Sequence, residues 1–361
     1  MNGRPGRGTP ASQGFRMPAE WEPHAATWIA WPHEARDWPG KLPAIRRVYA
    51  DIVRVLSESE RVEIVVQDAA QERAVVRALR SRGADLPRVR THRWSTDRSW
   101  VRDSGPTFLR RPPRGNAPGA VGIVRWKFNA WARYDNYQRD RRLPPRIARA
   151  LGFPIWKATA AGRWVVLEGG AFDVDGQGLL MTTEECLLSD VQVRNPGLGR
   201  SAIERVFRDY LGATSVVWLN RGIEGDDTHG HVDDAARFVA PATVLAVLPD
   251  DPASVDRSAL EENLERLRAF RTAGGRRLRI RTLPAPHPVT FRGQHLPASY
   301  ANFYIANHAV LVPTFHDPHD AEALGVLARA FPDREVVGIP SRDLVWGLGT
   351  LHCLTQPQPL P

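Results

Sequence analysis

The chain has few cysteines and no long apolar run, and each shortage excludes a class of protein. Two cysteines among 361 residues cannot form a disulfide framework, which favours a reducing compartment, so we expect a cytoplasmic protein. No apolar run approaches the roughly 18 residues that a membrane helix requires, so we expect no membrane partner. No glycine-rich phosphate loop opens a helix, so we find no nucleotide site.

Lysine is also scarce, because arginine supplies nearly all of the positive charge behind the formal net charge of +9. Arginines cluster at residues 139–146 and again at 266–281. A nucleic-acid interface would need a known module or a basic stripe interleaved with stacking aromatics, and the second cluster offers only Phe270. We therefore expect no nucleic-acid partner.

The rest of the composition, 42% hydrophobic and 25% charged, is that of a soluble globular protein. Glycine, proline and serine near the start predict a disordered extension over residues 1–16, followed by one folded domain over 17–361. Helical periodicity and short apolar runs alternate, which predicts an α/β fold. We expect helices at 43–57, 69–82, 144–151, 200–211, 256–273 and 320–330, and strands at 62–66, 121–126, 164–167, 178–182, 215–218, 236–239, 243–248, 303–306 and 309–312.

Cys353 follows the small residues of the turn 347–350, close to the end of the chain. A thiol on a sharp turn, flanked by Leu351 and Leu354, suggests a nucleophile presented to a pocket. A free cysteine is more often a small buried hydrophobe, and this is how we interpret Cys186. The functional interpretation of Cys353 therefore depends on finding a base and acids elsewhere in the chain.

Two further segments place an acid beside a turn. Asp103 follows Trp100 in the run WVRDSGP, and an aromatic face next to a carboxylate suits a planar cation. Glu168 follows the apolar run 165–167 and precedes two glycines; it could orient a histidine or be a buried structural acid. Glycine beside a charged residue allows close backbone approach, so we expect these segments to converge on one centre.

The segment 226–234, DDTHGHVDD, allows three interpretations. His229, His231 and Asp233 could bind zinc from one side of an extended strand. Alternatively, one histidine could serve as the base for Cys353 while an acid holds a cationic substrate. The segment could also be a polar strand end with solvated charges. A thiol nucleophile favours the second interpretation without excluding the others.

Four segments in order resemble the agmatine deiminase and bacterial-type peptidylarginine deiminase family of the guanidine-modifying pentein superfamily: WVRDSGP, LEGGAFDVDGQG with TTEECLL and RNP, GDDTHGHVDDAARF, and GLGTLHCLTQPQP. Shorter matches are MPAEWEPHAATWIAWP, KFNAW and LPASYANFYIAN, so the resemblance runs from about residue 17 to the end. It implies a single-domain α/β propeller of ββαβ-type units with fivefold pseudosymmetry. It also implies a site without metal or cofactor and hydrolysis of a guanidine to a urea. A homo-oligomer is compatible with it.

The resemblance also implies a role for each site residue. Cys353 is expected to be the nucleophile, His231 the general acid and base, and Glu168 the acid that orients it. Asp103 and Asp233 are expected to clamp the guanidinium, which is planar and always charged. The expected substrate-binding set is completed by Trp100, Arg98 and Asp227.

Departures from the family pattern concern the substrate. Many family members have an acid two residues before the tryptophan, where this chain has Arg98, which could repel the ammonium of agmatine or pair with a carboxylate. Leu348 stands where the family often has glycine, and His229 receives no role. We expect hydrolysis of agmatine, a small guanidine, to N-carbamoylputrescine and ammonia. The alternatives are a deiminase of free or peptidyl arginine, an amidinotransferase, a metal-dependent hydrolase and a non-catalytic binding module.

Overall fold

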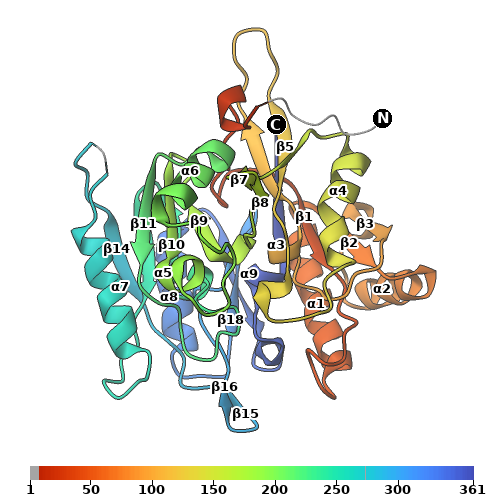
Figure 1. Cartoon of the computed structure of the whole chain (residues 1–361). Coiled ribbons are helices and arrows are strands. Elements are labelled where there is room, and N and C mark those ends of the chain that lie inside the picture. Colours follow the sequence, from red (N-terminus) through yellow and green to blue (C-terminus); the bar gives the residue numbers. More distant parts are fainter. Residues whose placement is uncertain (1–7, 273) are drawn as a thin grey trace.

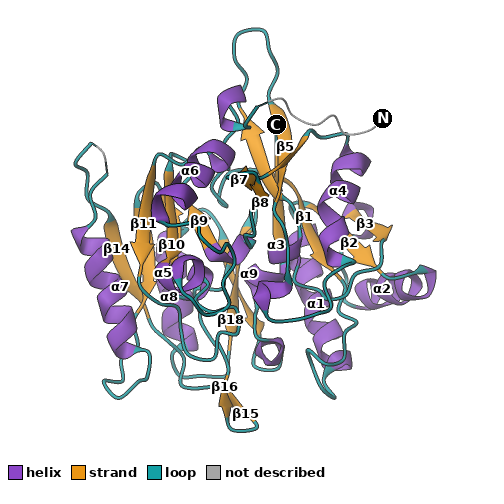
Figure 2. Cartoon of the chain, in the orientation of Figure 1, coloured by secondary structure: helices purple, strands orange, loops and turns teal. Residues whose placement is uncertain are grey.

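A computed structural model of the chain describes residues 8–272 and 274–361. Five of its sheets share one pattern, in which a middle strand pairs antiparallel with one neighbour and parallel with the other (Figures 1 and 2). The five sheets, each with its middle strand second, are β4 (Thr107–Arg111), β5 (Ala120–Arg125) and β6 (Ile155–Lys157); β9 (Phe172–Val174), β10 (Leu179–Thr183) and β11 (Ser215–Leu219); β12 (Ala236–Ala240), β13 (Thr243–Val247) and β14 (Arg279–Leu283); β17 (Tyr304–Ile305), β18 (Ala309–Thr314) and β19 (Glu335–Pro340); and β20 (Gln356–Pro359), β1 (His24–Ala30) and β2 (Arg61–Val66), with β3 (Val89–Arg93) added beside β2.

A helix connects the middle strand of each sheet to its parallel partner, because a parallel pair needs a crossover connection. In Figure 1, the helix between β13 and β14 and the helix between β1 and β2 lie towards the outside of the molecule. The connecting helices are α4 (Leu143–Leu151), α6 (Arg200–Leu211), α7 (Arg257–Ala269), α8 (Asp320–Ala330) and α1 (Leu42–Ser57), and α2 (Ala69–Ser81) leads on to β3. The alternation of helices and short strands confirms the predicted α/β class. No helix among the described residues is long and apolar enough to cross a membrane.

Most predicted elements are confirmed to within one or two residues, and two need correction. Helix α7 ends at Ala269 rather than in the 270s, because Phe270 has extended backbone (φ −61°, ψ 143°); residue 273 lies outside the described residues. The strand predicted at 164–167 is limited to β8 (Arg163–Trp164), which pairs with β7 (Thr159–Ala160). Residues 165–167 have no strand partner in the described sheets and lead as a loop towards Glu168.

The start of the chain also differs from expectation. Residues 1–7 of the predicted disordered extension lie outside the described residues, whereas residues 11–13 form a short 3₁₀ helix. Phe15 is buried and packs against Trp156, with ring centroids 5.1 Å apart. The backbone of Arg16 forms an antiparallel β-bridge with Arg110 of β4. Burial of this aromatic ring fixes the segment. The described residues of the predicted extension therefore include a short helix and a buried aromatic residue.

Short helical turns precede the first strand of four of the five sheets, and residues 299–303 precede the fifth. The turns are α3 (Val101–Ser104), η5 (Gly169–Ala171), η6 (Val232–Asp234) and α9 (Leu351–Leu354). Turn α3 contacts α9 and η5, and η5 contacts η6 and α9. Figure 1 shows α3 and α9 in the middle of the molecule. Five segments that lie far apart in the sequence are thus brought together, and the predicted site residues lie on or beside them.

Candidate active site

Cys353 lies on α9, and its side chain is almost fully buried. The amide of Asn302 contacts the sulfur (Nδ2 to Sγ, 3.1 Å), and Oδ2 of Asp233 lies 3.7 Å from it. Burial raises the pKa of the thiol well above its ordinary value, and the nearby carboxylates raise it further. A Cβ at position 349 would lie 3.1 Å from the sulfur and 3.0 Å from the ring of Trp100, so glycine leaves the turn free of these tight contacts. The thiol is thus presented to an acidic, enclosed centre.

Asp233 is buried on η6, between Cys353 and His352. Its Oδ2 lies 2.6 Å from Nδ1 of His352, whose Nε2 lies 3.1 Å from Glu20. Burial alone would raise the pKa of Asp233, but the contact with His352 outweighs it and the pKa falls below its ordinary value. The other oxygen, Oδ1, is buried and has no hydrogen-bond partner in the described part of the chain.

His231 is surrounded by three carboxylates. Its Nε2 lies 3.8 Å from Glu168, and its Nδ1 lies 3.9 Å from both Asp103 and Asp233. Burial alone would lower the pKa of His231, but these acids raise it to about 10. Glu168 is itself held by Arg194, whose Nε lies 3.3 Å from it. His231 is therefore charged at neutral pH and can donate a proton.

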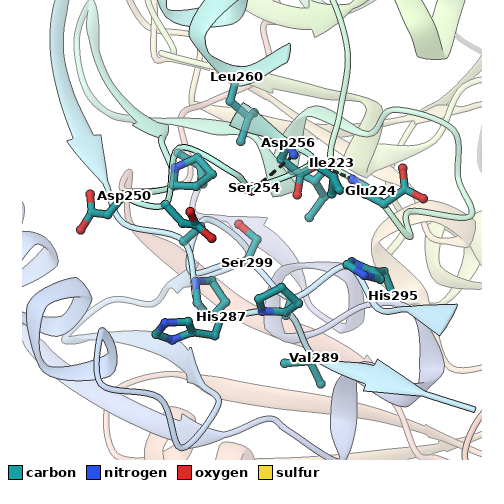
Figure 3. A pocket seen from close by; sticks show the side chains of 18 of the residues that line it. Ile223, Glu224, Asp250, Ser254, Asp256, Leu260, His287, Val289, His295 and Ser299 are labelled. Carbon is teal, nitrogen blue, oxygen red and sulfur yellow. Dashed lines mark hydrogen bonds between the residues drawn. The ribbon is translucent and has the colours of Figure 1, made fainter. Parts of the chain in front are cut away.

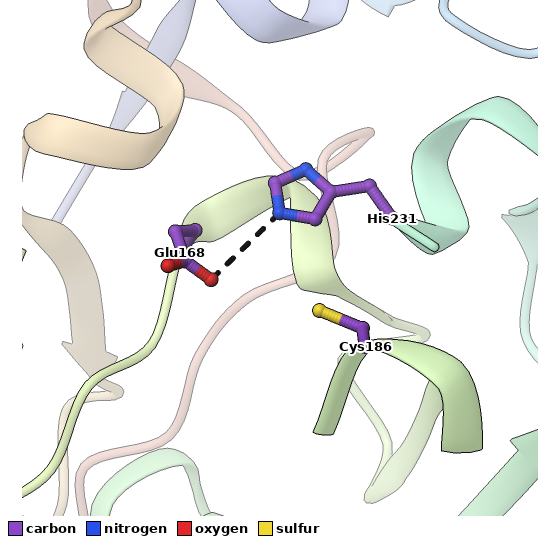
Figure 4. Close-up of side chains that lie close together, drawn as sticks. All are labelled: Glu168, Cys186 and His231. Carbon is purple, nitrogen blue, oxygen red and sulfur yellow. Dashed lines mark ion pairs between the residues drawn. The ribbon is translucent and has the colours of Figure 1, made fainter. Parts of the chain in front are cut away.

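Figure 4 shows the thiol of Cys186 beside His231 and Glu168. These three side chains form one of the groups in the described structure whose donor atoms converge closely enough to hold a metal ion. The guanidinium of Arg194, bound to Glu168, opposes a cation at this position. Burial raises the pKa of Cys186 well above its ordinary range, so this thiol stays protonated.

Asp103 lies on α3 with both oxygens engaged. Oδ1 accepts a hydrogen bond from the backbone N–H of Gly170 (2.8 Å), and Oδ2 accepts one from the indole of Trp131 (2.8 Å). A side chain at Gly170 would come within 2.5 Å of the His231 ring, so glycine permits this approach. The ring of Trp100 lies over the turn at Gly349, beside Cys353. The backbone at Gly170 thus lies close to His231, and the backbone at Gly349 lies close to Trp100 and Cys353.

Arg98 and Asp227 both contact Tyr134, which lies in the segment 129–140. Nη1 of Arg98 lies 3.1 Å from Asp37, and its guanidinium stacks 4.0 Å from the ring of Tyr134. The Tyr134 hydroxyl donates to Oδ2 of Asp227 (2.5 Å). Burial raises the pKa of Asp227 to about 6, so most of this carboxyl group is ionised at pH 7. The carboxylate partner of Arg98 within the protein is thus Asp37.

The zinc interpretation of His229, His231 and Asp233 is not supported by the geometry. His229 has positive φ (65°) and lies in a loop, and residues 232–234 form a 3₁₀ turn, so the three do not share a strand face. Nε2 of His229 lies 3.0 Å from the hydroxyl of Ser189. Neither His229 nor Asp233 belongs to the groups of described residues that could hold a metal.

Three buried residues of the centre were not singled out in the sequence. Asn302 contacts both the thiol of Cys353 and Oδ1 of Asp234 (2.9 Å), and it lies in the uncharged run LPASYANFYIAN, whose resemblance to the family assigned it no role. His352 could have been found, because it is the immediate neighbour of Cys353. Arg194 opens the RNP segment that resembles the family, but the resemblance assigned it no role. Leu348 has φ +67°, a backbone region that favours glycine, which explains the glycine common at this position.

Known proteins match this chain over nearly its whole length. The family described as Porphyromonas-type peptidyl-arginine deiminase matches residues 16–359. The agmatine deiminase of Pseudomonas putida (strain KT2440) is 37% identical over 377 residues, which cover 98% of each chain. The agmatine deiminase of Ectopseudomonas mendocina is 35% identical over 376 residues, again covering 98% of each chain.

Solved structures give the same result. An agmatine deiminase of Enterococcus faecalis, described as catalysing its reaction, superposes with a TM-score of 0.89 at 32% identity and covers 99% of each chain. A C. jejuni agmatine deiminase variant with substrate bound gives a TM-score of 0.83 at 25% identity, covering 95% of this chain and 96% of that one. This chain therefore belongs to the Porphyromonas-type peptidyl-arginine deiminase family.

Proposed function

We propose that this protein is an agmatine deiminase, which hydrolyses the guanidinium of agmatine to N-carbamoylputrescine and ammonia. The observation that carries the proposal is Oδ1 of Asp233, which is buried without a hydrogen bond in the described part of the chain, on the carboxylate whose Oδ2 lies 3.7 Å from the thiol of Cys353. A buried carboxylate oxygen without a partner is costly, and a guanidinium N–H would satisfy it. Family membership and the names of the relatives support the same reaction.

Asp103 and Asp233 would hold the guanidinium through its nitrogens. Two carboxylates offset the cost of removing this cation from water and fix its central carbon near Cys353. The bound cation also offsets the nearby negative charge that raises the pKa of Cys353. Substrate binding would therefore favour the thiolate, which is the nucleophilic form.

The reaction then has two stages. In the first, the thiolate of Cys353 forms a bond to the guanidinium carbon, and His231 donates its proton to the departing nitrogen. The carbon–nitrogen bond breaks, ammonia leaves, and a covalent amidino-thioether remains. In the second, neutral His231 takes a proton from water and the oxygen adds to the same carbon. The carbon–sulfur bond then breaks and releases the ureido product and the thiolate. Glu168 would hold His231 in position for both transfers.

The choice of agmatine over arginine rests on the outer part of the site. Arg98 is paired with Asp37, so its charge is offset before any substrate arrives. Asp227 offers a carboxylate for the terminal ammonium of agmatine, whereas the carboxylate of arginine would be repelled. The relatives reported above are named agmatine deiminases. This favours agmatine over arginine and over an amidinotransferase reaction.

Replacement of the nucleophile tests the mechanism. Cys353→Ala should abolish ammonia release from every guanidine tested, by at least about 10³-fold, because it removes the thiolate that would form the covalent intermediate. Labelling with a haloacetamidine, followed by peptide mass spectrometry, provides an internal control. The label should appear on Cys353 and not on the buried Cys186. Retained turnover by the variant would contradict the mechanism.

A substrate panel tests the identity of the guanidine. Agmatine, arginine, methylarginines and arginine peptides are compared by kcat/KM, and agmatine should exceed arginine by at least about 10²-fold. Equal or greater activity on arginine would replace agmatine as the substrate. Loss of activity on chelation, restored by zinc, would favour a metal-dependent hydrolase.

We further propose that the five similar sheets form a propeller with fivefold pseudosymmetry and make one catalytic domain. The shared strand pattern and the helical turns before the first strands support this arrangement. Each unit would then contribute one segment to the centre. Matching Cα traces of the five units, after rotation about one axis, would test the proposal.

A further inference from the structure

A cavity of about 440 Å³ lies apart from the proposed catalytic residues (Figure 3). It is lined by apolar residues of the 247–260 and 285–298 segments and by several acids and imidazoles. Its residues include Asp250, His287 and His319, and the first two are labelled in Figure 3. The cavity includes none of the residues assigned to the deimination above.

Two of these histidines meet at one carboxylate. Nδ1 of His287 lies 2.9 Å from Oδ2 of Asp317, and Nδ1 of His319 lies 2.9 Å from Oδ1 of the same residue. The backbone N–H groups of both histidines also donate to Asp317, at 3.0 and 2.9 Å. The carboxylate is therefore fixed by the backbone, independently of the two imidazole rings.

We propose that His287, His319 and Asp317 form a binding site for a zinc-like transition-metal ion at the mouth of this cavity. Their donor atoms lie within 4.8 Å of one another. In a tetrahedral zinc site, neighbouring nitrogen and oxygen ligands are roughly 3.3 Å apart, so the observed 2.9 Å contacts need only a small opening. The ion would take the place of the protons that the two imidazoles share with Asp317.

Two features of the surroundings support a metal ion. Nε2 of His319 lies 3.7 Å from Asp250, which gives this imidazole the outer carboxylate that metal-bound histidines commonly have. The side chain of His287 is 63% exposed, so an ion can reach the site from solvent. Three protein ligands leave one position for water. Imidazole donors favour zinc, cobalt or nickel over calcium and magnesium, which prefer oxygen.

The site would connect two loops. His287 follows β14, whereas Asp317 and His319 lie between β18 and the start of α8. An ion held by both would stabilise the folded chain by binding it selectively. This inference goes beyond the proposed function, because the site and its ligands are separate from the deimination.

Calorimetric titration of the metal-free protein with Zn²⁺ tests the proposal. Cys353→Ser is used as the background, so that the catalytic thiol does not contribute. One equivalent should bind, and His287→Ala and His319→Ala should each weaken its binding at least about 10-fold. The double variant should lose that equivalent. The control, His295→Ala, changes an imidazole of the same cavity outside the cluster and should leave the affinity unchanged. Mg²⁺ should give no binding heat.

Two results would overturn the proposal: no zinc binding by the parent protein, or unchanged binding by the double variant. Unchanged binding would assign the zinc to another site, such as the cluster around Cys186. Circular dichroism checks that each variant is folded. The titration needs no turnover, so its outcome is independent of whether agmatine is the substrate.

Discussion

The two sides of the proposed catalytic centre are built in opposite ways. One side, which we call the floor, is a network of buried charges: Glu20, Arg102, Asp173, Arg237 and His352. Glu20 contacts Arg102 (2.6 Å), Arg237 (3.0 Å) and His352 (3.1 Å). The other side, which we call the roof, is the segment 129–140. It carries Trp131 in a short 3₁₀ turn and the half-buried Tyr134 in the loop that follows.

The floor is over-determined, whereas the roof is strained. Each floor charge has at least one oppositely charged partner, so its geometry is held by several contacts at once. In the roof, Ala130, Trp131 and Ala132 have positive φ of 52°, 60° and 56°. Such backbone costs non-glycine residues roughly 1–2 kcal/mol each. We therefore propose that the floor holds the proposed catalytic residues in place and that the roof contributes to the choice of substrate.

The largest effect is expected from removing the central cation of the floor. Arg237 is fully buried and pairs with Glu20 and with Asp173 (3.2 Å). Arg237→Met would leave two buried carboxylates short of a partner, so the free energy of unfolding should fall by about 3–5 kcal/mol. Urea denaturation measures this loss. Arg205→Met, at an exposed position of α6, should stay within about 0.5 kcal/mol. Equal effects would show that the floor is not rigid.

The next largest effect is expected from the contact between His352 of the floor and Asp233, a proposed catalytic residue. His352→Gln removes the 2.6 Å contact with Asp233, a charge-assisted bond worth about 1.5–3 kcal/mol, so kcat/KM should fall about 10- to 100-fold. His352 lowers the pKa of Asp233, so its loss raises that pKa. The acid limb of the pH profile of kcat/KM should therefore move to higher pH. A merely structural role would lower the whole profile without moving it.

His229→Asn is the matched control for this histidine. His229 lies outside the carboxylate cluster and contacts Ser189, and asparagine tolerates its positive φ. Activity and pH profile should stay near those of the parent protein. An acid-limb shift in this variant would contradict the separate roles given to the two histidines.

The same contrast explains what could be predicted from sequence. Helices α1, α2, α6 and α8 were predicted nearly to the residue, because their apolar periodicity is strong. Strands such as β6 and β9 are too short to show alternation, and they form only by pairing with a longer neighbour. The contacts of Asn302 with Cys353 span 51 residues, and no local pattern reports a contact of that kind.

The proposed catalytic residues were found through the ordered motifs, not through spacing alone. The zinc interpretation of His229, His231 and Asp233 failed because it assumed an extended strand where the chain turns. Arg98 is the opposite case. The sequence identified the residue, but only the structure shows its partner, Asp37, which lies 61 positions away. A charge on its own in the sequence does not reveal whether it faces the substrate or another side chain.

Breaking the ion pair between Asp37 and Arg98 should have a smaller effect, which depends on the substrate. Asp37→Asn should leave Arg98 unpaired near the ammonium of agmatine, and raise KM about 5-fold with little change in kcat, an effect of about 1 kcal/mol. Activity on arginine relative to agmatine should increase. Burial raises the pKa of Asp37 to about 7 despite the opposing effect of Arg98. In the parent protein, KM for agmatine should therefore rise as the pH falls through about 7.

Two comparisons check this interpretation. The variant should show no such pH dependence near pH 7, because its amide does not titrate. Adding Arg98→Gln to the variant should restore KM, because it removes the unpaired charge. A variant that keeps the parent's KM and selectivity would mean that Arg98 does not face the substrate.

The smallest effect tests the strain in the roof itself. Ala132 has φ +56°, a conformation that glycine adopts without cost, so Ala132→Gly should raise the free energy of unfolding by about 0.5–1 kcal/mol. The reverse is expected in regular helix: Ala78→Gly in α2 should lower it by about 1 kcal/mol. If strain in the roof also positions Trp131 over Asp103, then the stabilised variant should bind agmatine less tightly, because a freer backbone holds the indole less firmly. A variant that gains stability with an unchanged KM would separate the two, and would make the strain a cost of this sequence rather than part of substrate binding.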